Sequence, residues 1–253
     1  MCLILFAHQA HDDYPLIVAA NRDEWHNRPT VPSEFWDTHP DLLAGRDLQA
    51  GGTWMGITRA GRFAALTNFR DVEAYDPAAP SRGLLVLDYL RDRVGAESYL
   101  NGLAQRAGAY RGFNILAGDM RDLYFYSNRQ SAASRVQPGV HGLSNALMDT
   151  PWPKVRRGME AIQAQLDGTP TAEALLDLLE RTDQAPDEAL PQTGVSLDWE
   201  RRLSAAHILH SEYGTRSATV FLRHRSGQCI WVERSYDPEG HTQIERRFEF
   251  QST

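Results

Sequence analysis

Cysteine is scarce in this chain of 253 residues, which contains only Cys2 and Cys229. Two cysteines exclude a disulfide framework and any metal or iron–sulfur site built from cysteines alone. The sequence also has no apolar run that approaches the roughly 18 residues required to cross a membrane. Its N-terminus has a short apolar run, but neither a basic leader nor a small-residue cleavage site, so it does not resemble a secretory signal. We therefore expect a cytoplasmic protein with no membrane span.

Basic residues are outnumbered by acidic ones. Lys and Arg total 26 against 33 Asp and Glu, which gives a formal net charge of −7. Because a polyanion binder needs a basic surface, this balance argues against nucleic acid as a partner, although a local basic groove is compatible with it. The hydrophobic fraction is 42% and the length is ample for a substantial core, and we expect one domain over residues 1–253.

Short apolar runs separated by polar turns predict strands that pair locally and mostly antiparallel. The predicted strands cover residues 3–7, 16–20, 53–58, 63–68, 113–117, 123–126, 215–222, 229–234 and 243–250. Helices are predicted from an N-cap at Ser81 to about residue 94, and over 96–107, 154–166 and 171–181. Residues 182–194 are predicted to form a loop. This order predicts an α+β fold in which helices cover antiparallel sheets.

The most informative residue is Cys2, directly after the initiator Met. Met removal is expected before so small a side chain, and it leaves a free α-amine beside a thiol. The reference pKa is about 7.7–8.0 for the amine and about 8.5 for the thiol. An amine of that basicity can activate the side chain of its own residue as a nucleophile. The alternatives are a structural cysteine at the start of a strand, or a retained Met1 that blocks the amine.

Four polar residues end the second predicted strand: Asn21, Arg22, Asp23 and Glu24. A hairpin centred between residues 11 and 12 places Cys2 opposite Asn21, and a slip of one residue would exchange the faces of the strand. An Arg with a carboxylate beside a thiol favours the thiolate and orients the amine. A solvated charge cluster is the alternative. The sequence leaves open whether Asn21 or Arg22 lies nearest to Cys2.

Three further polar residues lie at strand ends. Asn68 and Asn145 each follow an apolar segment, and side-chain amides there suit an oxyanion hole, with turn capping as the alternative. Arg216 begins a strand after a Gly and could clamp a carboxylate or lie on the surface. His207 and His210 are three apart on an expected helix, but two histidines without a third ligand predict no metal site.

The chain resembles the NRDE family, the transport and Golgi organisation type 2 group. The motifs that carry this resemblance span nearly the whole chain: MC at the start, ANRDE at 20–24, GGTWMG at 51–56, TNFR at 67–70, SRG at 81–83, GFN at 112–114, YSNR at 126–129, GLSN at 142–145, PWPK at 151–154 and YGTRS at 213–217. The family resembles N-terminal nucleophile hydrolases, which implies a four-layer αββα sandwich. Within that fold it looks most like cysteine amidases such as penicillin V acylase and bile salt hydrolase.

The resemblance to these amidases also implies roles for residues. Cys2 matches their nucleophile, Asn68 and Asn145 fall in segments similar to their two active-site Asn positions, and Arg216 is similar to their late-strand Arg. The amidases carry Arg, two residues and then Asp on the second strand. That spacing aligns either Asn21 with the Arg and Glu24 with the Asp, or Arg22 with the Arg and Trp25 with the Asp.

We therefore predict an N-terminal nucleophile hydrolase that acts on a non-peptide amide C–N bond and requires no cofactor. Cys2 would attack the carbonyl while its α-amine moves the proton. The supporting residues are Asn68 and Asn145 at the oxyanion, and Asn21 or Arg22, Asp23, Glu24 and Arg216 around the amine and substrate. The resemblance also implies an alternative, a non-catalytic carrier of haem or of a lipid or acyl ligand, with haem as transported cargo. A trafficking factor that acts through a protein surface is a third hypothesis.

Overall fold

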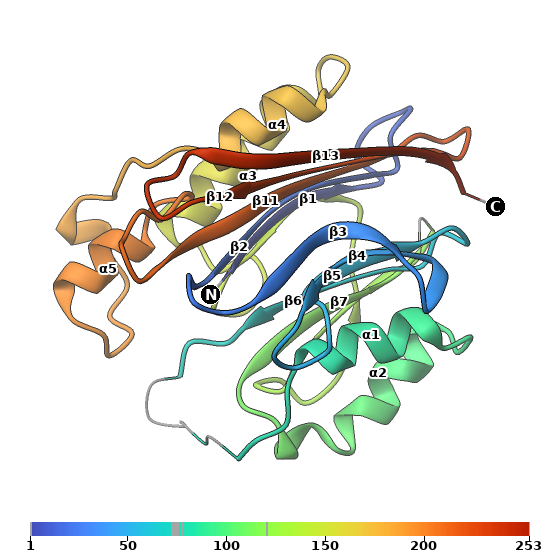
Figure 1. Cartoon of the computed structure of the whole chain (residues 1–253), viewed down its shortest axis with the longest axis horizontal. Helices are drawn as coiled ribbons and strands as arrows, with labels where there is room; N and C mark the ends of the chain where they lie inside the picture. Colours follow the sequence, from blue (N-terminus) through green and yellow to red (C-terminus); the bar gives the residue numbers. More distant parts are fainter. Residues whose placement is uncertain (1, 72–75, 77, 120, 253) are drawn as a thin grey trace.

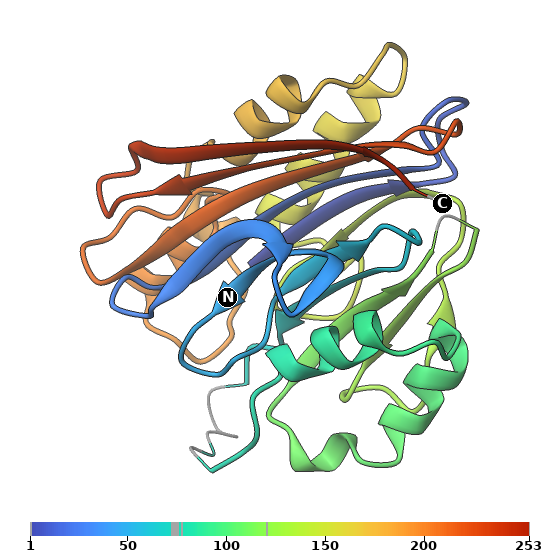
Figure 2. The ribbon, with the colours of Figure 1, turned by 45° about the vertical axis from the view of Figure 1, so that its right-hand side comes forward.

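The computed structural model describes residues 2–71, 76, 78–119 and 121–252. Two antiparallel sheets lie face to face, and helices cover the outer face of each (Figures 1 and 2). One sheet has the order β10 (Gly139–Leu143), β1 (Cys2–His8), β2 (Leu16–Trp25), β11 (Tyr213–Arg223), β12 (Gln228–Tyr236) and β13 (Thr242–Gln251). The other has the order β3 (Thr30–Trp36), β4 (His39–Asp47), β5 (Met55–Thr58), β6 (Phe63–Asn68), β7 (Phe113–Gly118), β8 (Leu123–Ser127) and β9 (Ser134–Arg135).

The helices form the outer layers. They are α1 (Gly83–Arg91), α2 (Ala96–Ala104), α3 (Pro153–Gln165), α4 (Ala172–Leu179) and α5 (Leu197–Leu203), with short 3₁₀ turns at Ala107–Ala109 and Asp187–Ala189. Figure 1 shows α1 and α2 on the sheet that contains β5–β7, and α3 and α4 on the sheet that contains β1 and β11. None of the helices in the described residues is long and apolar enough to cross a membrane.

Side-chain alternation along the strands produces three separate apolar interfaces. In β1, Ile4 and Phe6 pack between the two sheets, whereas Leu3 and Leu5 pack beneath α3 and α4. A third cluster lies between the second sheet and α1 and α2. Because successive side chains of a strand point to opposite faces, strands buried on both faces need nearly continuous apolar sequence, as β1 has. Three interfaces separate four layers, so the predicted αββα sandwich is confirmed.

The structure corrects the predicted pairing of the first hairpin. Cys2 pairs with Arg22, and Leu3 pairs with Asn21, so the expectation that Cys2 lies opposite Asn21 was wrong by one residue. The loop comprises residues 9–15, and the Gln9 N–H donates to the Pro15 carbonyl at 2.8 Å. An odd number of loop residues centres the hairpin on a residue rather than between two, which shifts the register by one.

Some predicted elements differ from the structure. The hairpin β3–β4 and helix α5 were not predicted. The N-cap of α1 is Arg82 rather than Ser81, and no side chain caps that helix. Residues 207–210 are not helical, so the expected placement of His207 and His210 on a helix was also wrong.

Candidate active site

A cavity of about 540 Å³ lies beside the N-terminal end of β1. Its wall includes Cys2 and Asn68, together with Trp54 and four arginines: Arg22, Arg28, Arg82 and Arg111. Cys2 starts the central strand β1 and is half-buried, so the fold fixes its backbone while its thiol contributes to the cavity wall. A residue at the start of an interior strand, in the wall of a cavity, is well placed to meet a small ligand that enters the cavity.

Strand alternation assigns the four residues from Asn21 to Glu24 to two different layers. Arg22 shares the inter-sheet face with Cys2, and Glu24 also lines the cavity. Asn21 points to the helix side, where its Nδ2 donates to the carbonyls of Leu179 and Ala206 at 2.8 Å each. Asn21 is therefore a structural clamp between β2 and the segments that cover it, and Arg22 is the member of the pair that lies nearest to Cys2.

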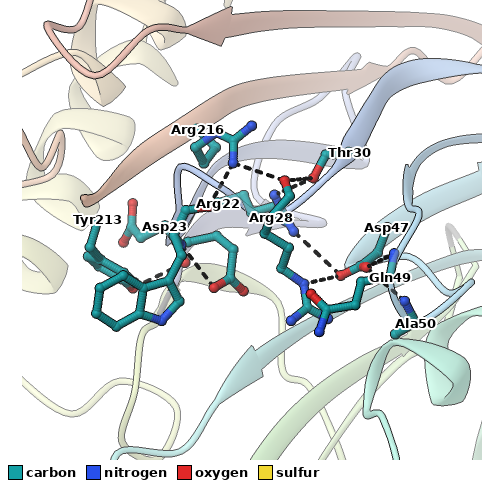
Figure 3. Close-up of polar contacts among 11 residues, drawn as sticks. Arg22, Asp23, Arg28, Thr30, Asp47, Gln49, Ala50, Tyr213 and Arg216 are labelled. Carbon is teal, nitrogen blue, oxygen red and sulfur yellow. Dashed lines mark hydrogen bonds and ion pairs between the residues drawn. The ribbon is translucent and has the colours of Figure 1, made fainter. Parts of the chain in front are cut away.

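Arg22 is held in place from three directions. Its guanidinium carbon lies 4.3 Å from the centre of the Trp54 ring, its Nη1 donates to Thr30 Oγ1 at 3.2 Å, and its Nη2 lies 3.6 Å from Asp47 Oδ2. Arg28 Nε donates to the same Asp47 oxygen at 2.6 Å. Figure 3 shows both arginines reaching toward Asp47. A side chain fixed in this way offers a positive charge at a defined position beside Cys2.

Asp23 is fully buried on the opposite face of β2. Its Oδ1 accepts a hydrogen bond from Thr215 Oγ1 at 2.7 Å, and its Oδ2 lies 3.9 Å from Lys154 Nζ. Lys154 comes from the first turn of α3, and its side chain is 1% exposed. Burial raises the pKa of the Asp23 carboxyl, which the Lys154 ammonium opposes, and burial lowers the pKa of Lys154. Asp23 and Lys154 therefore form a buried pair of oppositely charging side chains one residue along β2 from Arg22, the partner of Cys2.

The electrostatics at Cys2 combine opposing effects. Burial raises the pKa of the Cys2 thiol, and the Asp23 carboxylate adds to this rise. The Asp23 backbone N–H and the Arg22 guanidinium favour the thiolate and oppose it. Because burial is the largest of these effects, the pKa of the Cys2 thiol lies above its ordinary value.

A buried polar cluster joins the two sheets next to the site. Ser144 Oγ lies 3.0 Å from the Cys2 carbonyl oxygen and 3.2 Å from Asn145 Oδ1. Asn145 Nδ2 donates to the Asn68 carbonyl at 2.8 Å. Asn114 Nδ2 donates to Thr67 Oγ1 at 3.0 Å, one residue before Asn68. These bonds fix the end of β6 relative to the start of β1, and so set the distance between Asn68 and Cys2.

Arg216 occupies a bulge in β11, where the register with β2 shifts between Thr215 and Ser217. Its Nη1 donates to the carbonyl of Trp25 at 2.8 Å and to that of Arg28 at 3.2 Å. Figure 3 shows Arg216 above Arg28. Arg216 therefore holds the turn that carries Arg28. Arg216 is not one of the described residues that line the cavity.

A close approach between two glycines places Arg82 in the cavity wall. A Cβ atom on Gly52 would lie 2.5 Å from the carbonyl carbon of Gly83, and the Thr53 N–H donates to the Gly83 carbonyl at 3.2 Å. Only glycine permits backbones to pass this closely. The Gly-Gly-Thr-Trp and Ser-Arg-Gly segments are thus in direct contact, with Arg82 beside the cavity.

A family model described as Transport and Golgi organisation 2 matches residues 1–238. The chain belongs to this family. The Mus musculus protein named Transport and Golgi organization 2 homolog is 36% identical over 258 residues, which cover 93% of each chain. The Homo sapiens homolog is 35% identical over 257 residues and also covers 93% of each chain. The Drosophila melanogaster protein is 29% identical and covers 98% of this chain and 99% of its own.

Two solved structures are similar to this chain at low sequence identity. A Caenorhabditis elegans N-acylethanolamine-hydrolyzing acid amidase ortholog covers 87% of this chain and 92% of its own, with a TM-score of 0.48 and 11% identity. The C2A mutant of the conjugated bile acid hydrolase from Clostridium perfringens covers 100% of this chain and 98% of its own, with a TM-score of 0.45 and 10% identity.

The structure brings together some of the predicted site residues of this family member and separates others. The cavity is lined by Cys2, Arg22, Glu24 and Asn68. Asp23 also contributes to its wall, although its carboxylate contacts Thr215 and Lys154 on the helix side of β2. The remaining three lie behind its wall and clamp backbone: Asn21, Asn145 and Arg216.

Sequence reasoning gave no role to four residues that shape the site. Trp54, Arg82 and Lys154 lie in the family motifs GGTWMG, SRG and PWPK, so the motifs could have identified them. Asp47 lies in β4, whose hairpin was not predicted, and no local pattern marks it.

Proposed function

We propose that this protein is a cysteine-dependent N-terminal nucleophile hydrolase that cleaves a non-peptide amide C–N bond. The observation that carries the proposal is the placement of Cys2 in the wall of the cavity, opposite Arg22 and with Asn68 in the same wall. Acyl transfer uses an activated nucleophile and a hydrogen-bond donor to the oxyanion, and a cation beside a thiol favours the thiolate.

The proposed reaction begins once Met1 is removed. The α-amine of Cys2 takes the thiol proton as Sγ attacks the carbonyl carbon, and the amide of Asn68 donates to the developing oxyanion. The C–N bond then breaks, and the ammonium proton passes to the leaving nitrogen. Water attacks the resulting thioester, the α-amine accepts a proton from that water, and the carboxylic acid leaves as Sγ is reprotonated.

The buried Asp23 is the proposed partner of the α-ammonium that forms in each half of this cycle. It lies one residue beyond Arg22, the partner of Cys2, and Thr215 fixes one of its oxygens. Lys154 favours its ionised form in a place where burial opposes charge. We assign Asn145, Ser144 and Arg216 positioning roles because their side chains bond to backbone carbonyls around the site.

The carrier of haem or of an acyl ligand stays the alternative. All nine histidines lie in the described residues, and none lines the cavity. The cavity would thus offer haem iron the thiolate of Cys2 but no imidazole. The charged lining, with Arg22 fixed beside the thiol, favours the hydrolase over the carrier.

The test is turnover of a panel of amides by wild-type protein and by Cys2→Ala and Cys2→Ser variants. The panel contains N-acyl aminocoumarins of increasing acyl length and N-acyl amino acids. We expect release of the amine by the wild type, a fall of more than about 10³-fold in Cys2→Ala, and an acyl-enzyme mass adduct on Cys2. Cys229→Ser is the matched control and should keep full activity, because Cys229 lies buried in the core away from the cavity. Turnover that survives in Cys2→Ala would contradict the proposal.

A further inference from the structure

The wall of the cavity beside Cys2 contains one guanidinium, that of Arg82, that forms no ion pair with a carboxylate of the described residues. Its wall has four arginines, and its carboxylates are Asp23, Glu24 and Asp47. Asp47 is bound by Arg28 at 2.6 Å and lies 3.6 Å from Arg22. Asp23 belongs to the helix side of β2 and lies 3.9 Å from Lys154. Asp47 and Asp23 therefore already have cationic partners other than Arg82.

The cavity wall also contains the charged side chains of Glu24 and Arg82. Glu24 Oε1 accepts a hydrogen bond from the backbone N–H of Trp25 at 3.0 Å. Arg82 Nη1 donates to the Gly112 carbonyl at 2.8 Å, and in the part of the chain that the structure describes no ion pair joins Arg82 to a carboxylate. A guanidinium has five N–H donors in a planar fork. One bond to a carbonyl leaves donors for an anion in the cavity.

The charge of Arg82 persists at neutral pH. Burial and, to a lesser extent, the neighbouring Arg111 guanidinium lower its pKa to about 10, whereas Cys2 and Glu24 act in the opposite direction. A cation that is protonated, partly desolvated and next to a second cation gains from an anion that enters the cavity.

The position of Arg82 is fixed by its backbone. The residue precedes the first turn of α1, and Gly83 is held against Gly52 and Thr53. A preorganised guanidinium loses little freedom when it binds a ligand, and it forms paired bonds with a carboxylate or a phosphate.

We propose that Arg82 binds an anionic group of the substrate, so that the amide attacked by Cys2 carries a carboxylate or another oxyanion. This inference rests on the proposed function for the identity of the attacked bond, but the anion site itself does not. Arg82 is thereby a specificity-determining residue, and a neutral amide of equal size is a poorer substrate than its anionic counterpart.

The first test compares two alkylating reagents that differ in charge. In the Cys229→Ser background, we compare the rate at which anionic iodoacetate labels Cys2 with the rate for neutral iodoacetamide. Arg82→Gln should lower the iodoacetate/iodoacetamide ratio by about tenfold, and Arg82→Lys by less. Arg93→Gln is the matched control, because Arg93 is exposed beyond the other end of α1, and it should leave the ratio unchanged. An equal ratio in all four proteins would overturn the proposal.

The second test does not need a reactive thiol. Binding of N-benzoylglycine, N-benzoylglycinamide and phenyl phosphate to the Cys2→Ala variant is followed by ligand-observed NMR, with and without Arg82→Gln. We expect N-benzoylglycine to bind more tightly than the neutral amide and to lose about tenfold in affinity with Arg82→Gln, while the amide is unaffected. Preference for phenyl phosphate would identify the oxyanion as a phosphate. Equal binding of the charged and neutral benzoyl compounds would overturn the proposal.

The two tests separate this inference from the proposed function. Anion binding that depends on Arg82, together with a Cys2 that neither reagent labels, supports the anion site and contradicts the hydrolase. A reactive Cys2 whose labelling ratio is indifferent to Arg82 supports the nucleophile and contradicts the anion site.

Discussion

Cys2 and Arg22 face each other across the antiparallel pair β1–β2, and both side chains belong to the face that looks into the space between the sheets. The adjacent residues Asn21 and Asp23 consequently belong to the helix side, where they contact the loops and helix that cover the strand. One short polar segment thus supplies the cavity with charge and also anchors the layer behind it. A register slip of one residue would move Asn21 and Asp23 to the cavity side and Arg22 to the helix side.

The pair formed by Lys154 and Asp23 predicts a pH-dependent loss of stability in Lys154→Met. Removal of one partner of a buried ion pair leaves an uncompensated charge, with an expected cost of about 3 kcal/mol. Without the ammonium, the folded-state pKa of Asp23, already raised by burial, rises further. A carboxyl whose pKa is higher in the folded than in the unfolded state stabilises the fold below its unfolded pKa, and that stability is lost as pH rises through the folded pKa.

Urea unfolding of Lys154→Met should therefore give a larger deficit at about pH 8 than at about pH 5. The titratable groups that act on the pair include Cys2, Arg70 and His207, and these are unchanged in the variant. The double variant Lys154→Met/Asp23→Asn is the control and should show a weaker pH dependence. A deficit that is the same at both pH values in the single variant would argue against an ionised pair.

Asn68 and Asn114 should separate catalysis from stability. Asn68→Ala is expected to lower the rate of Cys2 acylation by p-nitrophenyl acetate by about 10²-fold, because an oxyanion donor is lost, and to leave Tm nearly unchanged. The side-chain amide of Asn114 instead donates hydrogen bonds to buried partners, including Thr67 Oγ1 at 3.0 Å. Asn114→Ala should lower the unfolding free energy by about 1–3 kcal/mol while the folded fraction keeps its rate. Identical rate losses in the two variants would remove Asn68 from the proposed mechanism.

The approach of Gly52 to Gly83 predicts a large effect from a single methyl group. Gly52→Ala places a Cβ 2.5 Å from the Gly83 carbonyl carbon, and the backbone must shift at a cost of about 1–3 kcal/mol in unfolding free energy. Gly102→Ala is the matched control, since Gly102 is exposed in α2 with open space around its Cα position. That variant should gain up to about 1 kcal/mol from helix propensity. Denaturant titration of both variants measures the contrast, and an unaffected Gly52→Ala would refute the close approach.

His141 and Asp149 form a pH-sensitive contact at the surface. The Nδ1 of His141 lies 2.8 Å from Asp149 Oδ2, and this bond raises the pKa of His141. Stability from a raised histidine pKa is fully present below the unfolded value and is lost as pH rises through the folded pKa. His141→Gln should therefore destabilise the protein more at about pH 5.5 than at about pH 8, by about 0.5 kcal/mol, because Asp149 is partly exposed and solvent screens the pair. Thermal denaturation at the two pH values measures this difference.

The sequence predicted the layers more successfully than the site. Short continuous apolar runs in β1 and β2 identified the first hairpin, because these strands are buried on both faces. It missed β3 and β4, since β3 contains Pro32, pairs irregularly between Val31 and Glu34, and buries little of its length. Asp47, which holds two cavity arginines, lies in this missed hairpin.

The role of each residue in the site also depends on register and on long-range contacts, which no local sequence pattern contains. The register at Cys2 followed from the length of one loop. The roles of Arg82 and Lys154 depend on contacts between segments far apart in the chain, with Gly52 in one case and Asp23 in the other. Sequence motifs marked these residues without showing which partners they would meet.

The central claim is that Cys2 is a free N-terminal nucleophile activated by its own amine. The most direct measurement is the intact mass of the Cys229→Ser protein before and after a timed exposure to iodoacetamide near neutral pH. The account predicts a mass that lacks Met1, and a single adduct on Cys2 that forms faster than on the same thiol in denatured protein. Because burial raises the pKa of this thiol, labelling faster than in the denatured protein would show that its surroundings activate it, as the proposed α-amine would. A retained Met1, or labelling no faster than in the denatured control, would contradict the account.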